Sequence, residues 1–134
     1  MRRMTLAAAA IATLASAGAL HAADKPTGEE QLAKILEGRV AGEPVSCIDT
    51  GMTRQMRIID KTAIVYDAGS VIYVNRPSNP SVLDSDDILV TKQNGRQLCR
   101  LDIANMADRT GMWQRGSVSL GDFVPYRRPA APQN

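Results

Sequence analysis

Histidine and aromatic residues are scarce in this sequence, and both scarcities restrict what the protein can do. The only histidine is His21, which lies in the N-terminal segment. The rest of the chain therefore has no imidazole for a Ser-His-Asp or Cys-His nucleophile system, or for a histidine-containing zinc site. Aromatic residues make up 4% of the chain, so a core must be built mainly from aliphatic side chains.

A clustered positive charge is also lacking. The chain has 16 lysine and arginine residues against 14 acidic residues, and Arg2 and Arg3 account for the excess. Nucleic-acid binding normally requires a basic stripe, so we expect no nucleic-acid partner. The sequence contains no glycine-rich phosphate loop and no cluster with metal-ligand spacing, so we expect no cofactor.

Strongly apolar runs of membrane-spanning length are missing as well. Two arginines precede an apolar run dominated by alanine, Met4–Leu20, and small residues follow it. A spanning helix needs about 20 strongly apolar residues, and this run is shorter and contains Thr, Ser and Gly. The pattern predicts a signal peptide at 1–22, cleaved after Ala22, with Ala23 and 17–19 as alternatives. We therefore expect a periplasmic or secreted protein with no membrane span after cleavage.

The 134-residue chain without this leader is long enough for one small domain. Residues 23–44 form a lead-in, in which Thr27 and Glu30 have the spacing of a helix capping box. Leu32 and the two apolar residues at 35 and 36 then repeat with helical spacing, which predicts a short helix at about 28–37. Residues 45–126 form a β domain, and 127–134 lack any apolar pattern and predict a disordered tail.

The β domain consists of short β-branched runs separated by turn residues. We expect an antiparallel meander of about seven or eight short strands, arranged as a sandwich or a partly open barrel, with the helix packed on it. Asn94 and Gly95 supply a tight turn between two of these runs. The segment 103–107 fits either a strand or a short helix. The expected strands are 45–49, 55–60, 63–67, 71–75, 88–91, 97–101, 117–120 and 123–126.

Cys47 and Cys99 are the only cysteines, and each lies in an expected strand. An even number of cysteines in an exported domain favours a structural disulfide. Two free buried thiols are an alternative, and so is a redox-active pair, although no C-x-x-C spacing is present.

Three further features are candidates for chemistry. Asp84, Asp86 and Asp87 could bind a hard cation, or they could form a solvated acidic loop beside a strand. Several arginines, among them Arg54 and Arg57, could converge on an anionic ligand, with scattered surface ion pairs as the alternative. Trp113 is expected to cover one end of the core, and an exposed contact residue is the alternative.

Five segments together resemble a family of small exported bacterial proteins of unknown function. They are 44–48, 58–64, 71–75, 98–102 and 120–125, and the resemblance covers about 43–126. It implies a compact, mostly β domain, and it brings no activity, cofactor or catalytic residue. Many members carry two further cysteines, and the corresponding segments here, 80–83 and 118–120, have none. The resemblance therefore implies that Cys47 pairs with Cys99.

These observations favour an exported envelope protein that acts as a non-enzymatic structural or binding module with an unknown ligand. The alternatives are a small carboxylate-dependent hydrolase that uses the aspartates at 84, 86 and 87, and an arginine-lined anion-binding protein. The partner is unknown, and a component of the cell envelope is a candidate.

Overall fold

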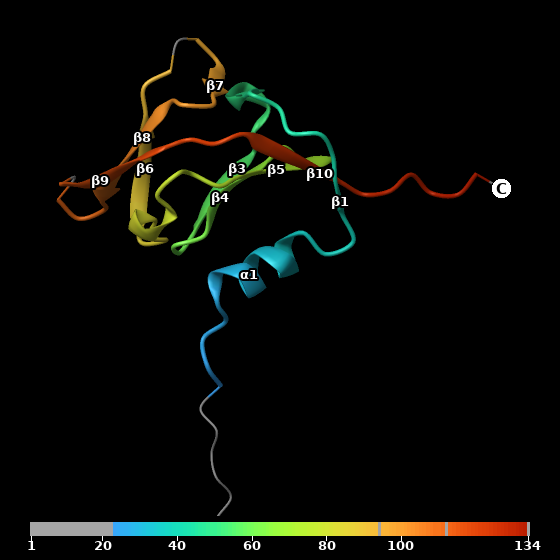
Figure 1. The fold of residues 1–134 in the computed structure, drawn as a ribbon, viewed down its shortest axis with the longest axis horizontal. Coiled ribbons are helices and arrows are strands. Elements are labelled where there is room, and N and C mark those ends of the chain that lie inside the picture. The colour runs from blue at the N-terminus through green and yellow to red at the C-terminus, as the bar shows by residue number, and fades with distance from the viewer. Residues whose placement is uncertain (1–22, 94, 112, 134) are drawn as a thin grey trace, which may run out of the picture.

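A computed structural model describes residues 23–93, 95–111 and 113–133. The predicted signal peptide and Asn94 lie outside these residues. Within them the chain forms one α-helix and ten β-strands (Figure 1), and this confirms the mostly β prediction. The elements are α1 (Gly28–Ile35), β1 (Val40–Ala41), β2 (Cys47–Asp49), β3 (Gln55–Ile59), β4 (Ala63–Asp67), β5 (Val71–Asn75), β6 (Asp87–Thr91), β7 (Gln97–Cys99), β8 (Ile103–Asp108), β9 (Gln114–Ser119) and β10 (Phe123–Arg127). Two short 3-10 helices lie at Thr50–Met52 and Pro80–Val82.

The strands form three antiparallel sheets. The largest has the order β1-β10-β5-β4-β3, the second pairs β2 with β7, and the third has the order β6-β8-β9. Strands β3, β4 and β5 follow one another as a meander. The ambiguous segment 103–107 is a strand, and the lead-in contributes the short β1, which we did not predict.

The connection between β6 and β7 differs from our prediction. The predicted tight turn would pair these two strands with each other, but β7 pairs with β2 and β6 pairs with β8. Gly95 does have a positive φ of 76°. The turn chemistry is therefore present, but the pairing of Cys47 with Cys99 across β2 and β7 holds β7 in another sheet.

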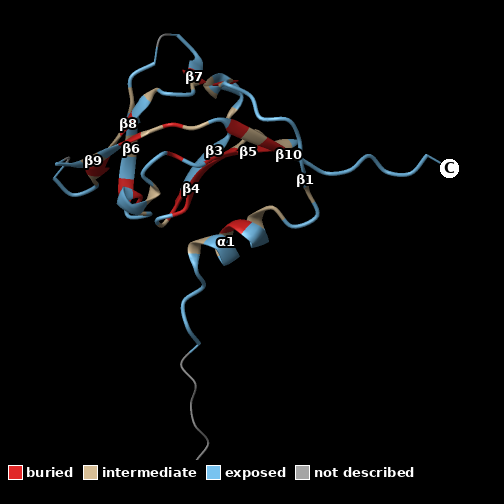
Figure 2. Cartoon of the chain, viewed as in Figure 1, coloured by how far each residue is buried: buried red, intermediate tan, exposed pale blue. Residues whose placement is uncertain are grey.

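The five-stranded sheet packs on both faces, because its inner strand β4 is apolar and buried at four consecutive positions, 63–66. On one face, Ile64, Tyr66 and Phe123 pack towards β8, β9 and the β2-β7 pair. On the other face, residues such as Ala63 and Val65 pack with the helix. Figure 2 shows the buried segments concentrated in the central strands, with one buried stripe on the helix.

Helix α1 begins as the sequence predicts. Thr27 N–H donates to Glu30 Oε2 at 2.7 Å, and Glu30 N–H donates to Thr27 Oγ1 at 3.3 Å, which completes the capping box. Leu32 is buried against the outer face of the sheet, and the helix ends two residues earlier than we expected. Among the described residues, no helix has the length and apolarity that crossing a bilayer requires.

Candidate functional site

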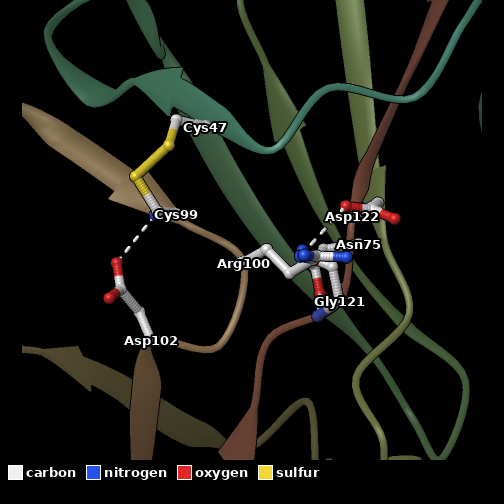
Figure 3. Close-up of a disulfide and its surroundings, with 7 residues drawn as sticks. All are labelled: Cys47, Asn75, Cys99, Arg100, Asp102, Gly121 and Asp122. Atoms are coloured by element: carbon white, nitrogen blue, oxygen red, sulfur yellow. Dashed lines mark hydrogen bonds and ion pairs between the residues drawn. A yellow bond between two sulfur atoms is a disulfide. The ribbon is translucent and has the colours of Figure 1, made fainter.

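The two cysteines form a disulfide, which confirms that prediction. They lie directly opposite each other in β2 and β7, with 4.0 Å between their Cα atoms (Figure 3). Behind the bridge, the Asp102 carboxylate accepts a hydrogen bond from Cys99 N–H at 2.7 Å. Both sulfur atoms take part in this bond, so the described residues contain no free thiol.

The acidic residues at 84–87 do not converge on one point. Asp84 accepts a hydrogen bond from Asp86 N–H at 2.9 Å, within the turn before β6. Asp87 turns inwards, is 4% exposed, and pairs with Arg115 at 3.5 Å. In the part of the chain that the structure describes, no three His, Cys, Asp or Glu side chains gather as a metal site would require.

Trp113 does not cover the core as we predicted. It is 76% exposed, and it lies in the connection between β8 and β9. A Cβ at Gly111 would overlap its indole ring, so the ring rests on its own loop.

A groove runs between β3 and β6, which are edge strands of two different sheets. At one end it is closed by hydrogen bonds from Ser85 N–H to Asp60 Oδ1, at 2.6 Å, and from Lys61 N–H to Leu83 O, at 3.0 Å. The Ser85 hydrogen bond lowers the pKa of the Asp60 carboxyl. Because the end of β3 lies beside the start of β6, the two strands run in opposite directions along the groove.

The opposite end of the groove is closed by the 3-10 helix after β2. Thr50 Oγ1 donates to Gln93 Oε1 at 3.0 Å, and Thr50 N–H donates to Arg96 O at 2.8 Å. Between these two closures, no β-bridge joins β3 to β6 within the described residues. We call this open stretch between Gln55–Ile59 and Asp87–Thr91 the strand-edge groove.

On the β3 side, main-chain groups point into the strand-edge groove. Successive residues of an antiparallel strand direct N–H and C=O to opposite sides. Ala68 N–H donates to Val71 O, so the main-chain groups of Ala68 face β5. Those of the preceding residue, Asp67, therefore face β3, and Asp67 O does accept a hydrogen bond from Arg54 N–H. The same alternation along the β3-β4 register leaves Met56 and Ile58 facing the groove.

The β6 side has the same property. Asp108 N–H donates to Trp113 O on the β9 side, so its neighbour Ala107 faces β6 and pairs with Ile88. By alternation, Leu89 and Thr91 direct their main chain into the groove. Both walls therefore present strand edges that no other strand among the described residues covers.

Two adjoining cavities, of about 450 and 260 Å³, open along the groove. Tyr66 lines the smaller cavity and is 4% exposed, with its ring edge-on to Phe123 at 5.8 Å. Its hydroxyl is buried without a hydrogen-bond partner among the described residues, and burial raises its pKa. The larger cavity is lined by Gln31, Ile35, Met56, Arg57, Ile58, Ile59, Ser85, Asp87, Ile88, Leu89 and Arg109.

The charges along the groove are mainly positive. Arg57 Nη2 donates to the neutral Gln55 amide oxygen at 2.9 Å. Arg109 Nε donates to the main-chain oxygen of Asp86 at 2.8 Å. No carboxylate among the described residues forms an ion pair with either guanidinium. The one carboxylate that lines the larger cavity, Asp87, is already paired with Arg115.

The structure brings two of the candidate arginines to this groove. Arg57 lines the larger cavity and Arg54 lines the smaller one. Arg109, which reaches the groove from the end of β8, is one of the several arginines that could converge on an anion by sequence, but nothing distinguished it from the others. Sequence reasoning did not single out Tyr66, which lines the smaller cavity. Neither carries a local sequence signal, because their positions depend on how two separate sheets meet.

The chain matches no known protein family, no curated protein and no solved structure.

Proposed function

We propose that this protein is an exported, non-catalytic binding module that takes an anionic ligand in the strand-edge groove. The observation that carries the proposal is the presence of two guanidinium groups, on Arg57 and Arg109, beside an open groove in which no carboxylate pairs with them. A cation that is held in place by neutral partners keeps its charge available for a ligand.

Export is supported by two independent features. The first 22 residues have the composition of a signal peptide, and the Cys47–Cys99 disulfide requires an oxidising compartment to persist. N-terminal sequencing of the protein from a periplasmic extract and from the culture medium tests export. The expected mature chain begins at Ala23, and recovery only of the uncleaved chain in the cytoplasm would contradict export.

Ligand binding is tested by nuclear magnetic resonance with three simple probes. Sodium sulfate, sodium phosphate and N-acetylglutamate N-methylamide are each titrated into the ¹⁵N-labelled protein at constant ionic strength. We expect saturable shifts of the Nε–H signals of Arg57 and Arg109 and of the main-chain amides of Met56 and Leu89 with at least one probe. Two exposed ion pairs contribute about 0.2–1 kcal/mol each, so the dissociation constant should be about 30 mM or weaker.

The matched variants are Arg57→Gln with Arg109→Gln, and Arg128→Gln as the control. Arg128 is exposed in the segment after β10 and does not line the groove. The double variant should lose the saturable shifts, and the control should keep them. Equal binding by both variants, or no saturable shift with any probe, would refute the groove as an anion site.

A further inference from the structure

Besides positive side chains, the walls of the strand-edge groove contain main-chain groups that are not paired with another strand. Met56 and Ile58 of β3 direct N–H and C=O groups into the groove, and no strand covers them among the described residues. An edge strand in this state is a template for another extended chain. A small anion would leave these main-chain groups to water, whereas an extended peptide would pair with them.

We propose that the ligand of the strand-edge groove is an extended polypeptide segment of a partner protein, which adds to β3 as an antiparallel strand and alternates apolar with acidic residues. The inference rests on the proposed function, since it uses the same groove. It specifies the ligand class, the edge that is used and the side-chain pattern.

The expected length follows from β3. The strand has five residues, Gln55–Ile59, and a strand rises about 3.4 Å per residue. The hydrogen bonds of Asp60 and Thr50 close the groove at its two ends. The bound segment therefore pairs over about five residues.

The expected pattern follows from the side chains of β3. The main chain of Met56 and Ile58 faces the groove, and their side chains lie on the face of the apolar core. Peptide residues opposite these two positions exchange main-chain hydrogen bonds with them and present their side chains to the same apolar face. They are therefore apolar.

The residue between them lies opposite Arg57. The main chain of Arg57 faces β4, so the peptide residue opposite it forms a non-hydrogen-bonded pair, in which the side chains of the two strands lie closest. An aspartate or glutamate at that position meets the guanidinium directly. On the flank of the groove, Lys25 and Lys34 line a shallow cavity together with Arg57 and add to the positive charge.

Segments of this chain are poor candidates for the occupant. Residues 1–22 contain no acidic residue, and 128–134 contain one arginine, two prolines and no acidic residue. The C-terminal segment also leaves from β10, which β5 and β4 separate from β3. Figure 1 shows this segment running away from the domain. A partner that supplies carboxylates is therefore the complementary ligand.

The probe is the capped heptapeptide acetyl-Ser-Val-Glu-Val-Glu-Val-Ser-amide, measured by isothermal titration calorimetry and by nuclear magnetic resonance. We expect it to bind at least tenfold more tightly than N-acetylglutamate N-methylamide, with shifts at Met56 and Ile58. The same peptide with lysine in place of glutamate should bind at least tenfold more weakly. If the small probe binds and the heptapeptide binds no more tightly, the peptide inference fails while the proposed function stands. If neither binds, both fail.

Backbone methylation identifies the edge. Methyl groups on the valine nitrogens remove the donors that face β3, and we expect at least a tenfold loss of affinity. Methyl groups on the glutamate nitrogens face away from β3, and affinity should stay within about threefold. The reverse result would assign pairing to β6 and overturn the assignment to β3.

Two protein variants provide a second test. Arg57→Glu should weaken the glutamate peptide and strengthen the lysine peptide, an exchange that general loss of structure cannot produce. Arg128→Gln lies outside the groove and should leave the affinity for both peptides unchanged. A second copy of this chain is the remaining possible occupant, and sedimentation analysis over a range of protein concentrations tests for it. A dimer that dissociates when the heptapeptide is added would assign the groove to a second copy and would contradict the proposal of a partner protein.

Discussion

Asn75 shows how one buried polar residue joins two segments of this domain. It is 0% exposed at the end of β5. Its amide donates to Gly121 O at 2.7 Å and accepts from Gly121 N–H at 3.0 Å (Figure 3). A Cβ at Gly121 would lie 2.5 Å from Arg76 O, so only glycine allows this close approach. The pair positions the chain as it enters β10.

Replacement of Asn75 by alanine should therefore be costly. It removes two hydrogen bonds and leaves the N–H and C=O groups of the half-buried Gly121 without these partners, for which we expect a loss of about 2–3 kcal/mol in the free energy of unfolding. Asn79→Ala is the matched control, because its amide also donates to a main-chain oxygen, of Ser117 at 2.9 Å, but at the surface. Urea denaturation measures both, and equal losses would contradict the role given to burial.

Asp108 is the carboxylate with the largest downward pKa shift among the described residues. Hydrogen bonds from the Thr110 hydroxyl and from the Thr110 and Gly111 N–H groups, aided by Arg115, lower its pKa from 3.8 to about 2. A depressed pKa in the folded state adds stability above about pH 4, and this is lost as the pH falls towards 2. The stability difference between the protein and Asp108→Asn should vanish over that range. Titration of the Asp108 carboxyl carbon near pH 3.8 would contradict this.

At the scale of elements, helix α1 depends on the packing of its first residue against the sheet and not on its own length. The helix has eight residues, too few to persist in water without packing. Its first residue, Gly28, lies against the turn between β3 and β4, where a Cβ would overlap Thr62 Oγ1 and approach Asp60 O to 2.7 Å. The absence of a side chain at Gly28 therefore determines how closely the helix approaches the sheet.

Gly28→Ala should consequently destabilise the protein despite the higher helix propensity of alanine. The added methyl group must displace the helix or the turn, and such overpacking typically costs about 1–3 kcal/mol. Lys34→Ala changes an exposed residue of the same helix and should stay within about 0.5 kcal/mol. Thermal unfolding of the two variants distinguishes packing from propensity, since a stabilised Gly28→Ala protein would show that propensity dominates.

At the scale of the molecule, the disulfide joins parts that the strands connect only weakly. Strands β2 and β7 have three residues each and form a sheet of their own. The bridge closes a loop with a sequence separation of 52. Ile48 and Leu98, which are neighbours of the cysteines, belong to the buried core. The bridge thereby keeps this small sheet over the core.

Removal of the bridge by Cys47→Ala with Cys99→Ala should lower the free energy of unfolding by about 2–4 kcal/mol. Reductant should destabilise the unmodified protein to the same extent and should leave the double variant unchanged. Urea denaturation with and without reductant provides the measurement. A loss below about 1 kcal/mol would mean that the apolar contacts of Ile48 and Leu98 hold the sheet without the bridge.

Local patterns identified most of the elements. The capping box at Thr27 predicted where the helix begins, because its hydrogen bonds are made within four residues. Short runs of β-branched residues between turn residues predicted β3, β4 and β5, because such side chains pack well on the surface of a sheet. The pairing of β7 with β2 was not predictable in this way, since a turn sequence specifies a local bend and not the distant partner of a strand.

The candidate site depends both on composition and on tertiary contacts. Composition by itself leaves residues 23–134 without histidine, supplies the arginines and provides two cysteines for one bridge, because these depend only on which residues are present. The strand-edge groove, the position of Arg109 and the burial of Tyr66 arise where β3 and β6, from different sheets, come together without pairing. Such a site depends on contacts between residues that are far apart in the chain, and a local sequence pattern does not predict which distant segments come together.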